Sequence, residues 1–173
     1  AALRFAEAGR GGVLAELPGE KLDAATQEIR KIADTDRPVL GVPTDVSDMA
    51  QVETLADRAF EAGPVAVLMN NAGIGMSSKT WEAYDAWERM MDINFFGVLR
   101  GVQAFTPRMI AAGRPAVIIN TGSKQGITTP PGNPGYNATK AAVKVLSEQL
   151  AHELREAGAP SSVHLFVPVF TFT

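Results

Sequence analysis

The 173 residues contain no cysteine. This absence excludes a disulfide framework, a cysteine nucleophile and a cysteine-ligated zinc site. The sequence also has no apolar run of about 18 residues, the length that a membrane-spanning helix needs, and it does not open on a basic segment followed by an apolar one. We therefore expect a cytoplasmic protein that does not associate with membranes.

The sequence also lacks a large excess of positive or negative charge. Sixteen Lys and Arg face nineteen Asp and Glu, a net charge of −3, which gives no electrostatic reason to bind nucleic acid. Hydrophobic residues make up 46%, as in an average soluble domain, and the length predicts one domain over residues 1–173. His152 and His164 have no partners at ligand spacing, so we predict no metal site.

Strand-like and helix-like segments alternate along the chain. Short apolar runs of strand length occupy residues 13–15, 39–42, 65–69, 116–120 and 163–167. Helical spacing of apolar residues occupies residues 1–8, 20–33, 52–60, 81–112 and 136–156. Runs without alternation are typical of parallel strands buried on both faces. The pattern predicts an α/β fold: a Rossmann-like, doubly wound parallel sheet with helices on both faces.

Two breaks in this pattern are also predicted. Pro107 should kink or break the helix over residues 81–112, because proline lacks the N–H that an interior helical position donates. The Gly- and Pro-rich stretch 126–135 should be a loop.

Tyr136 and Lys140 stand four residues apart in a predicted helix and therefore share a face. An ammonium group beside a phenol favours the phenolate and lowers a pKa that starts at about 10. Such a tyrosine can exchange a proton with an alcohol near neutral pH. Ser123 follows a predicted strand at the end where parallel sheets place ligands, so its hydroxyl could hold the same oxygen. The alternative is an ordinary surface pair.

Two amide-bearing positions are also candidates. Residues 70–73, Asn-Asn-Ala-Gly, follow a predicted strand and form either a polar turn or a strand end that approaches a ligand. Asn94 lies within the apolar stretch 90–96. A buried amide there needs hydrogen-bond partners, and one interpretation is a polar relay at a helix distortion. A surface or back-bonded Asn94 is the alternative.

Two acids follow predicted strands near the start of the chain. Asp45 is either a helix cap or an acceptor for a ligand amine. Glu16 is either a solvated loop acid or the acid that holds ribose hydroxyls at the end of the second strand of a dinucleotide-binding fold. Both interpretations stay open for both residues.

Together these motifs resemble the short-chain dehydrogenase/reductase family over essentially the whole chain. The matching elements, in order, are Asp45-Val46, Asn70-Asn71-Ala72-Gly73, Asn94, Ser123, Tyr136-Asn137-Ala138-Thr139-Lys140 and Pro168. The resemblance implies that Tyr136 is the catalytic acid/base and that Lys140 assists it. It also implies that Ser123 positions the substrate oxygen and that Asn94 holds a water in a proton relay to Lys140.

The same resemblance implies a nicotinamide cofactor. Because Glu16 would repel a 2′-phosphate, we expect NAD in preference to NADP. Tyr136 and Lys140 would also contact the cofactor, Asp45 and Val46 would meet its adenine, and Asn70 its adenosine side. The implied cofactor contacts are Glu16, Asp45, Val46, Asn70, Ala72, Tyr136, Lys140, Thr171 and Thr173.

The sequence departs from the family pattern in three ways. It contains no first strand with a Gly-rich TGxxxGxG turn, it has Val169 where the family usually has glycine, and it stops at Thr173. Without a first strand, the strands at 13–15 and 39–42 have no hydrogen-bonded link to the strand at 65–69. We therefore expect a dinucleotide-binding domain that is incomplete at both ends, part of a longer chain.

The resemblance implies an oxidoreductase that transfers a hydride between NAD(P) and a small alcohol or carbonyl substrate. A homodimer or homotetramer is expected. The alternatives are a non-catalytic relative that serves as a binding or scaffold protein, and an inactive fragment.

Overall fold

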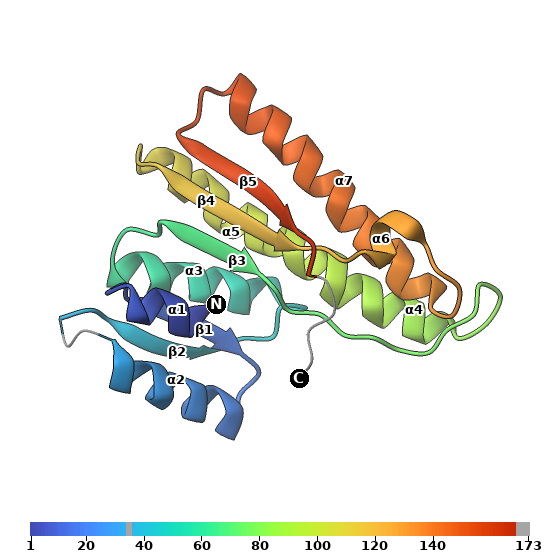
Figure 1. The fold of residues 1–173 in the computed structure, drawn as a ribbon, viewed down its shortest axis with the longest axis horizontal. Coiled ribbons are helices and arrows are strands. Elements are labelled where there is room, and N and C mark those ends of the chain that lie inside the picture. Colours follow the sequence, from blue (N-terminus) through green and yellow to red (C-terminus); the bar gives the residue numbers. More distant parts are fainter. Residues whose placement is uncertain (34–35, 169–173) are drawn as a thin grey trace. The chain divides into compact units, whose positions relative to one another are not determined.

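The computed structural model describes residues 1–33 and 36–168. The chain forms two compact units, Ala1–Pro64 and Val65–Thr173, each built around its own parallel sheet (Figure 1). In the described ranges, no helix has the length and apolar character needed to cross a membrane. Whether the two units form one domain stays a prediction.

The first unit alternates helices and strands. Its elements are α1 (Ala2–Glu7), β1 (Gly12–Glu16), α2 (Glu20–Ile32), β2 (Val39–Pro43) and α3 (Met49–Ala62). Strands β1 and β2 are parallel, with Gly12 opposite Val39. Buried Ala6, Ile29 and Val39 form a core cluster that joins α1, α2 and β2. The predicted helices and strands of this unit are therefore present.

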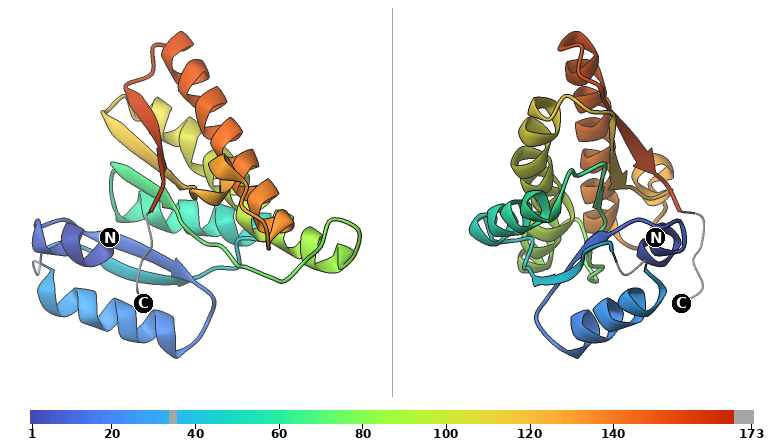
Figure 2. Two further views of the ribbon diagram at one scale, coloured as in Figure 1. Left: turned by 45° about the vertical axis from the view of Figure 1, so that its right-hand side comes forward. Right: turned by 90° about the vertical axis from the view of Figure 1, so that its left-hand side faces the viewer.

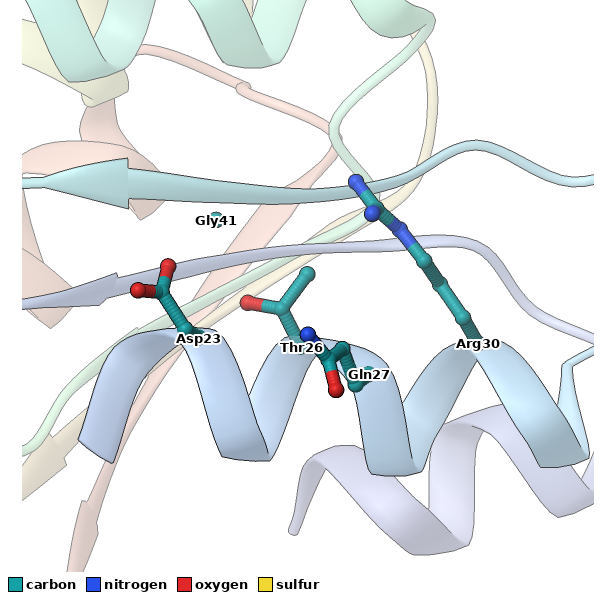
Figure 3. A pocket seen from close by; sticks show the side chains of 5 residues that line it. All are labelled: Asp23, Thr26, Gln27, Arg30 and Gly41. Atoms are coloured by element: carbon teal, nitrogen blue, oxygen red, sulfur yellow. The ribbon is translucent and has the colours of Figure 1, made fainter. Parts of the chain in front are cut away.

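A shallow pocket of about 120 Å³ lies between α2 and β2 (Figure 3). It is lined by Asp23, Thr26, Gln27, Arg30 and Gly41. Arg30 Nε donates to the Val39 main-chain oxygen over 3.0 Å. A Cβ atom at Gly41 would lie 2.5 Å from Thr26 Oγ1, so glycine allows α2 to approach β2 this closely. These contacts stabilise the packing of the unit itself.

The second unit holds the remaining elements. They are β3 (Val67–Asn70), α4 (Tyr84–Met91), the π-helix η1 (Asp92–Phe96), α5 (Gly97–Ala111), β4 (Ala116–Thr121), α6 (Gln125–Thr128), α7 (Pro134–Glu156) and β5 (Ser161–Phe166). The strands form a parallel sheet in the order β3-β4-β5. Helix α5 packs against β3, and α7 packs against β4 and β5 (Figures 1 and 2).

The long helix predicted over residues 81–112 is interrupted. Helix α4 begins at Tyr84 rather than at Trp81, and the π-helix η1 separates it from α5. Of the kink or break predicted at Pro107, the break is wrong, because α5 continues through Pro107 to Ala111; the kink stays a prediction. Pro107 is exposed, and buried residues on both sides of it, including Phe105 and Met109, hold the helix against its core.

The stretch predicted as a loop over residues 126–135 is partly helical. Its first residues belong to α6 (Gln125–Thr128), in which Gly126 is buried. A Cβ atom at Gly126 would lie 2.5 Å from the Lys140 carbonyl carbon. Only glycine permits this approach. Gly126 is therefore needed for the close packing of α6 on α7, although the sequence suggested that it was part of a loop.

Across the described residues, β1 and β2 form one sheet and β3, β4 and β5 form another. The strands predicted at 13–15 and 39–42 therefore belong to a different sheet from the strand predicted at 65–69. The parallel pairing within both sheets and the flanking helices match the predicted α/β class.

Candidate active site

Helix α7 begins at a cap that places Tyr136 in its first turn. Asn133 is the N-cap, and its Oδ1 accepts a hydrogen bond from Tyr136 N over 3.2 Å. Pro134 occupies the first helical position, where the missing N–H has no partner to lose. Ser78, which is buried, accepts from Gly135 N over 3.3 Å. The start of α7 is therefore fixed to the segment that follows β3.

Lys140 lies one turn further along α7 and is 4% exposed. Its Nζ donates to the main-chain oxygen of Thr121, at the end of β4, over 2.8 Å. The same nitrogen lies 5.6 Å from the centre of the Tyr136 ring. Burial lowers the pKa of Lys140, because leaving water disfavours the charged form. The cation is thus held between the end of a strand and the phenol ring.

Ser123 lies on the segment that joins β4 to α6. Its Oγ accepts from Gln125 N over 3.2 Å, and its carbonyl accepts from Gly126 N over 3.1 Å. Gly126 in turn packs against the main chain of Lys140. Ser123 and Lys140 are therefore held at the same end of β4.

Asn94 is fully buried within the π-helix η1. Its Oδ1 accepts from Ile74 N over 2.7 Å, and its Nδ2 donates to Ile74 O over 2.9 Å and to Thr139 Oγ1 over 3.1 Å. Thr139 Oγ1 donates to the Tyr136 carbonyl over 2.8 Å. Asn94 therefore lies at a helix distortion and ties the segment after β3 to the first turns of α7.

The segment after β3 passes close to both Asn94 and Lys140. A Cβ atom at Gly73 would lie 3.3 Å from Asn94 Oδ1 and 3.6 Å from Lys140 Nζ. Ala72 is exposed, and so is Asn71, whose Oδ1 accepts from Thr121 Oγ1 over 3.1 Å. The end of β3 thus offers accessible backbone beside the buried cation.

Asn70 faces inward rather than toward this open edge. Its Nδ2 donates to Asn120 Oδ1 over 2.9 Å, and a Cβ atom at Gly101 of α5 would overlap its amide oxygen. The half-buried side chain thus contacts β4 and α5. A contact between Asn70 and a cofactor stays a prediction.

The candidate residues of the first unit lie at the ends of its strands. Glu16, exposed, ends β1, and its Oε1 accepts from Leu17 N over 2.9 Å. Asp45 follows β2, and its Oδ1 accepts from Ser47 N over 2.9 Å and from Ser47 Oγ over 2.6 Å. Val46 is half-buried. The positions of these three residues match the predicted strand ends.

The interpretation of Asp45 as a helix cap is wrong. The N-cap of α3 is Asp48, whose side chain accepts from Ala50 N and Gln51 N. Hydrogen bonds from the Gln51 side chain and from Ala50 N hold the pKa of Asp48 below its ordinary value. Asp45 lies one turn too early to reach these N–H groups and closes a turn on Ser47 instead. Val169, Thr171 and Thr173 lie outside the described residues.

Several residues of this arrangement were not singled out from the sequence. Ile74 and Thr121 contribute main-chain atoms, for which a sequence carries no side-chain signal. Thr139 lies within the motif that ends at Lys140, and its hydroxyl could have been noted as a partner for Asn94. Ser78 and Asn133 act through the cap of α7, which depends on a contact between distant segments.

The family model described as short chain dehydrogenase matches residues 1–173. The chain belongs to the short-chain dehydrogenase family.

Named relatives and solved structures agree with this membership. The 1-deoxy-11-beta-hydroxypentalenate dehydrogenase of Streptomyces exfoliatus is 32% identical over 92% of this chain and 58% of its own length. The 3beta-hydroxysteroid dehydrogenase 2 of Eggerthella lenta is 34% identical over 90% of this chain and 60% of its own. The chain thus spans somewhat more than half the length of these relatives.

A crystal structure of a short-chain dehydrogenase/reductase from Burkholderia phymatum in complex with NAD matches with a TM-score of 0.90 and 37% identity. The match covers 98% of this chain and 60% of that one. The structure of an NAD⁺-bound xylitol dehydrogenase matches with a TM-score of 0.84 and 26% identity, over 96% of this chain and 62% of that one.

Proposed function

We propose that the full-length protein is an NAD(P)-dependent oxidoreductase that interconverts an alcohol and the corresponding carbonyl compound. The observation that carries the proposal is the buried Lys140 ammonium, which Thr121 O fixes beside the Tyr136 ring. Membership of the short-chain dehydrogenase family supports it. We further propose that both units belong to one dinucleotide-binding domain over residues 1–173.

The residues present fit a nicotinamide cofactor. Among the described residues, Lys140 Nζ makes one hydrogen bond, to Thr121 O, although an ammonium group has three N–H donors. The remaining donors suit ribose hydroxyls, and Gly73 keeps side-chain atoms out of the neighbouring space. In this proposal Tyr136 and Lys140 hold the nicotinamide ribose. When bound, the cofactor supplies the hydride acceptor or donor.

The protein's part in the reaction is to orient the substrate and to move a proton. Ser123 Oγ holds the substrate oxygen. In alcohol oxidation the Tyr136 phenolate takes the proton from the alcohol and becomes the hydroxyl, and in the reverse direction this hydroxyl gives the proton to the carbonyl oxygen. The Lys140 ammonium stabilises the negative charge that the phenol oxygen acquires. We propose that a water beside Asn94 passes protons on to Lys140, since Gly73 adjoins both side chains.

The remaining cofactor contacts are proposed from the family motifs. Asp45 and Val46 would meet the adenine, and Glu16 the ribose hydroxyls nearest to it. The proposal adds contacts from the end of β3 and from the last residues of the chain. These are Asn70, Ala72, Thr171 and Thr173.

The activity is tested by mixing the full-length protein with NAD⁺ or NADP⁺ and a panel of alcohols, and by following the absorbance of the reduced nicotinamide. The panel includes cyclic secondary alcohols, since two relatives are named for a hydroxypentalenate and a hydroxysteroid. We expect turnover with at least one alcohol. Binding of neither dinucleotide would overturn the proposal.

We propose NAD as the preferred cofactor, because an acid at the position of Glu16 repels a 2′-phosphate. Replacing Glu16 by Gln should raise the affinity for NADP⁺ relative to NAD⁺. Glu20, an exposed acid at the start of α2, provides the matched control, because Glu20→Gln removes the same charge without touching the strand end. An unchanged ratio of the two affinities in Glu16→Gln would refute this assignment.

A cytoplasmic homodimer or homotetramer is also proposed. Exposed apolar residues on the two long helices of the second unit, Ile110 on α5 and Val145 on α7, support self-association. Light scattering of the full-length protein measures its mass. A monomer at all accessible concentrations would refute the oligomer.

A further inference from the structure

A chain of hydrogen bonds runs from the half-buried Asn70 into the buried interior of the second unit. Asn70 Nδ2 donates to Asn120 Oδ1 over 2.9 Å, and Asn120 Nδ2 donates to Ser147 Oγ over 3.0 Å. Ser147 Oγ then donates to the Val143 carbonyl over 2.7 Å. Asn120 is fully buried and Ser147 is 4% exposed. Asn70 Nδ2, Asn120 Nδ2 and Ser147 Oγ therefore each donate directly to a protein acceptor.

The chain links three elements at fixed positions. Asn70 and Asn120 are opposite one another in the register of β3 and β4, and Ser147 is on α7. Asn120 directly precedes Thr121, the residue whose carbonyl accepts from Lys140. Ser147 follows Lys140 by seven residues, about two helical turns. Helix α7 is therefore tied to the end of β4 at two separate points.

Apolar packing around these hydrogen bonds defines the position of α7 along β4 less precisely than the hydrogen bonds do. The nearby buried side chains include Ile118 of β4 and Val143 and Leu150 of α7. Apolar contacts are non-directional, whereas hydrogen bonds weaken steeply with misalignment. A small slide of α7 would keep the apolar burial but would break the contact between Asn120 and Ser147. It would also move Lys140 relative to Thr121.

We propose that Asn120 and Ser147 are positioning residues, which set α7 along β4 so that Lys140 Nζ meets Thr121 O beside Tyr136. They act through Lys140 and touch neither substrate nor cofactor. This inference rests on the proposed oxidoreductase function for its kinetic consequences, but the geometry it describes can be measured without turnover.

The test compares three variants of the full-length protein. Ser147→Ala removes the acceptor of Asn120 Nδ2, and Ser147→Thr keeps a hydroxyl at the same atom. Thr26→Ala is the matched control, because Thr26 Oγ1 also donates to the carbonyl four residues earlier, Leu22 O, and within residues 1–33 and 36–168 this is its one hydrogen bond. If Ser147→Ala does not fold, Ser147→Cys replaces it with a weaker acceptor of similar size.

In Ser147→Ala we expect kcat for alcohol oxidation to fall about tenfold or more, the effect of slightly misplacing a reacting group, while the KM for the alcohol changes little. Ser147→Thr should restore kcat, and Thr26→Ala should match the unmodified protein. A merely structural role would lower stability without this split between kcat and KM. Unchanged kcat in Ser147→Ala would overturn the inference.

A crystal structure of Ser147→Ala provides a second readout that is independent of turnover. We expect Lys140 Nζ to have left the Thr121 carbonyl or to occupy several positions. An intact contact of the original length, in a variant whose α7 has not moved, would overturn the inference. Absence of turnover in the unmodified protein would instead count against the proposed function, and the crystallographic comparison would still decide the role of Ser147.

Discussion

Lys140 Nζ donates a 2.8 Å hydrogen bond to the carbonyl oxygen of Thr121. This bond joins the first turns of α7 to the end of β4, and it holds an ammonium group at a position that is 4% exposed. A cation buried in this way lowers stability unless its partners compensate. The second unit keeps it beside Tyr136, where the proposed reaction needs a positive charge.

The burial of Lys140 predicts an alkaline gain in stability. Its folded-state pKa lies below its ordinary value of 10.5, owing to burial, while the unfolded chain keeps the ordinary value. Between these two values the unfolded state binds more protons, so the free energy of unfolding rises with pH. Lys140→Met should be more stable than the unmodified protein near neutral pH, and this advantage should shrink as the pH approaches 10.5.

Urea denaturation at a series of pH values measures this difference. Lys144, an exposed lysine paired with Glu148, supplies the control variant Lys144→Met, which should show no such trend. A stability difference for Lys140→Met that stays constant with pH would contradict the burial argument.

Gly73 should be required for the site, whereas Gly75, two residues on, should not. A Cβ at Gly73 would lie 3.3 Å from Asn94 Oδ1, so the Asn94 side chain would have to move, while a Cβ at Gly75 meets nothing within 4 Å. We expect Gly73→Ala to lower kcat/KM about tenfold or more and Gly75→Ala to leave it unchanged. Steady-state kinetics of the two variants tests this, and equal activities would remove Gly73 from the site.

Removing the Asn94 side chain should destabilise the second unit. Asn94→Ala leaves the N–H and C=O of Ile74 without their present partners, at a cost of about 1–3 kcal/mol for each group that stays buried. The exposed Asn71 is the comparison, since Asn71→Ala should change the free energy of unfolding by no more than about 0.5 kcal/mol. Similar unfolding midpoints for both variants would show that Asn94 is not a structural tie.

The sequence predicted the order of elements because buried parallel strands and amphipathic helices leave distinct periodicities. For Asn94 the sequence offered two interpretations, a surface or back-bonded amide and a helix distortion, and the structure has the distortion. The sequence missed α6 because the approach of Gly126 to the main chain of Lys140 depends on two segments meeting in space. The break predicted at Pro107 was wrong because the rule for proline considers only the local backbone. It does not include the tertiary packing of the buried residues on both sides of Pro107 in α5.

At the candidate active site, the sequence predicted the side chains better than it predicted their hydrogen-bond partners. The spacing of Tyr136 and Lys140 fixes a shared helical face, and the structure places Lys140 Nζ close to the Tyr136 ring. The acceptor of Lys140 is a main-chain oxygen, which any residue at position 121 would supply. The hydrogen bond from Asn70 Nδ2 to Asn120 Oδ1, its register partner, was not anticipated. Such pairings depend on strand register, which short motifs do not encode.

The central claim is that Tyr136 transfers the proton in an alcohol oxidation. Tyr136→Phe removes only the phenol oxygen, and Tyr84→Phe is the matched control, since Tyr84 is the other of the two tyrosines and is 75% exposed. With the full-length protein, NAD⁺ and a turned-over alcohol, we predict that kcat falls about 10²–10⁴-fold in Tyr136→Phe. Binding of NADH, followed by tryptophan fluorescence, should be largely retained. Turnover by Tyr136→Phe at the level of Tyr84→Phe would contradict the account.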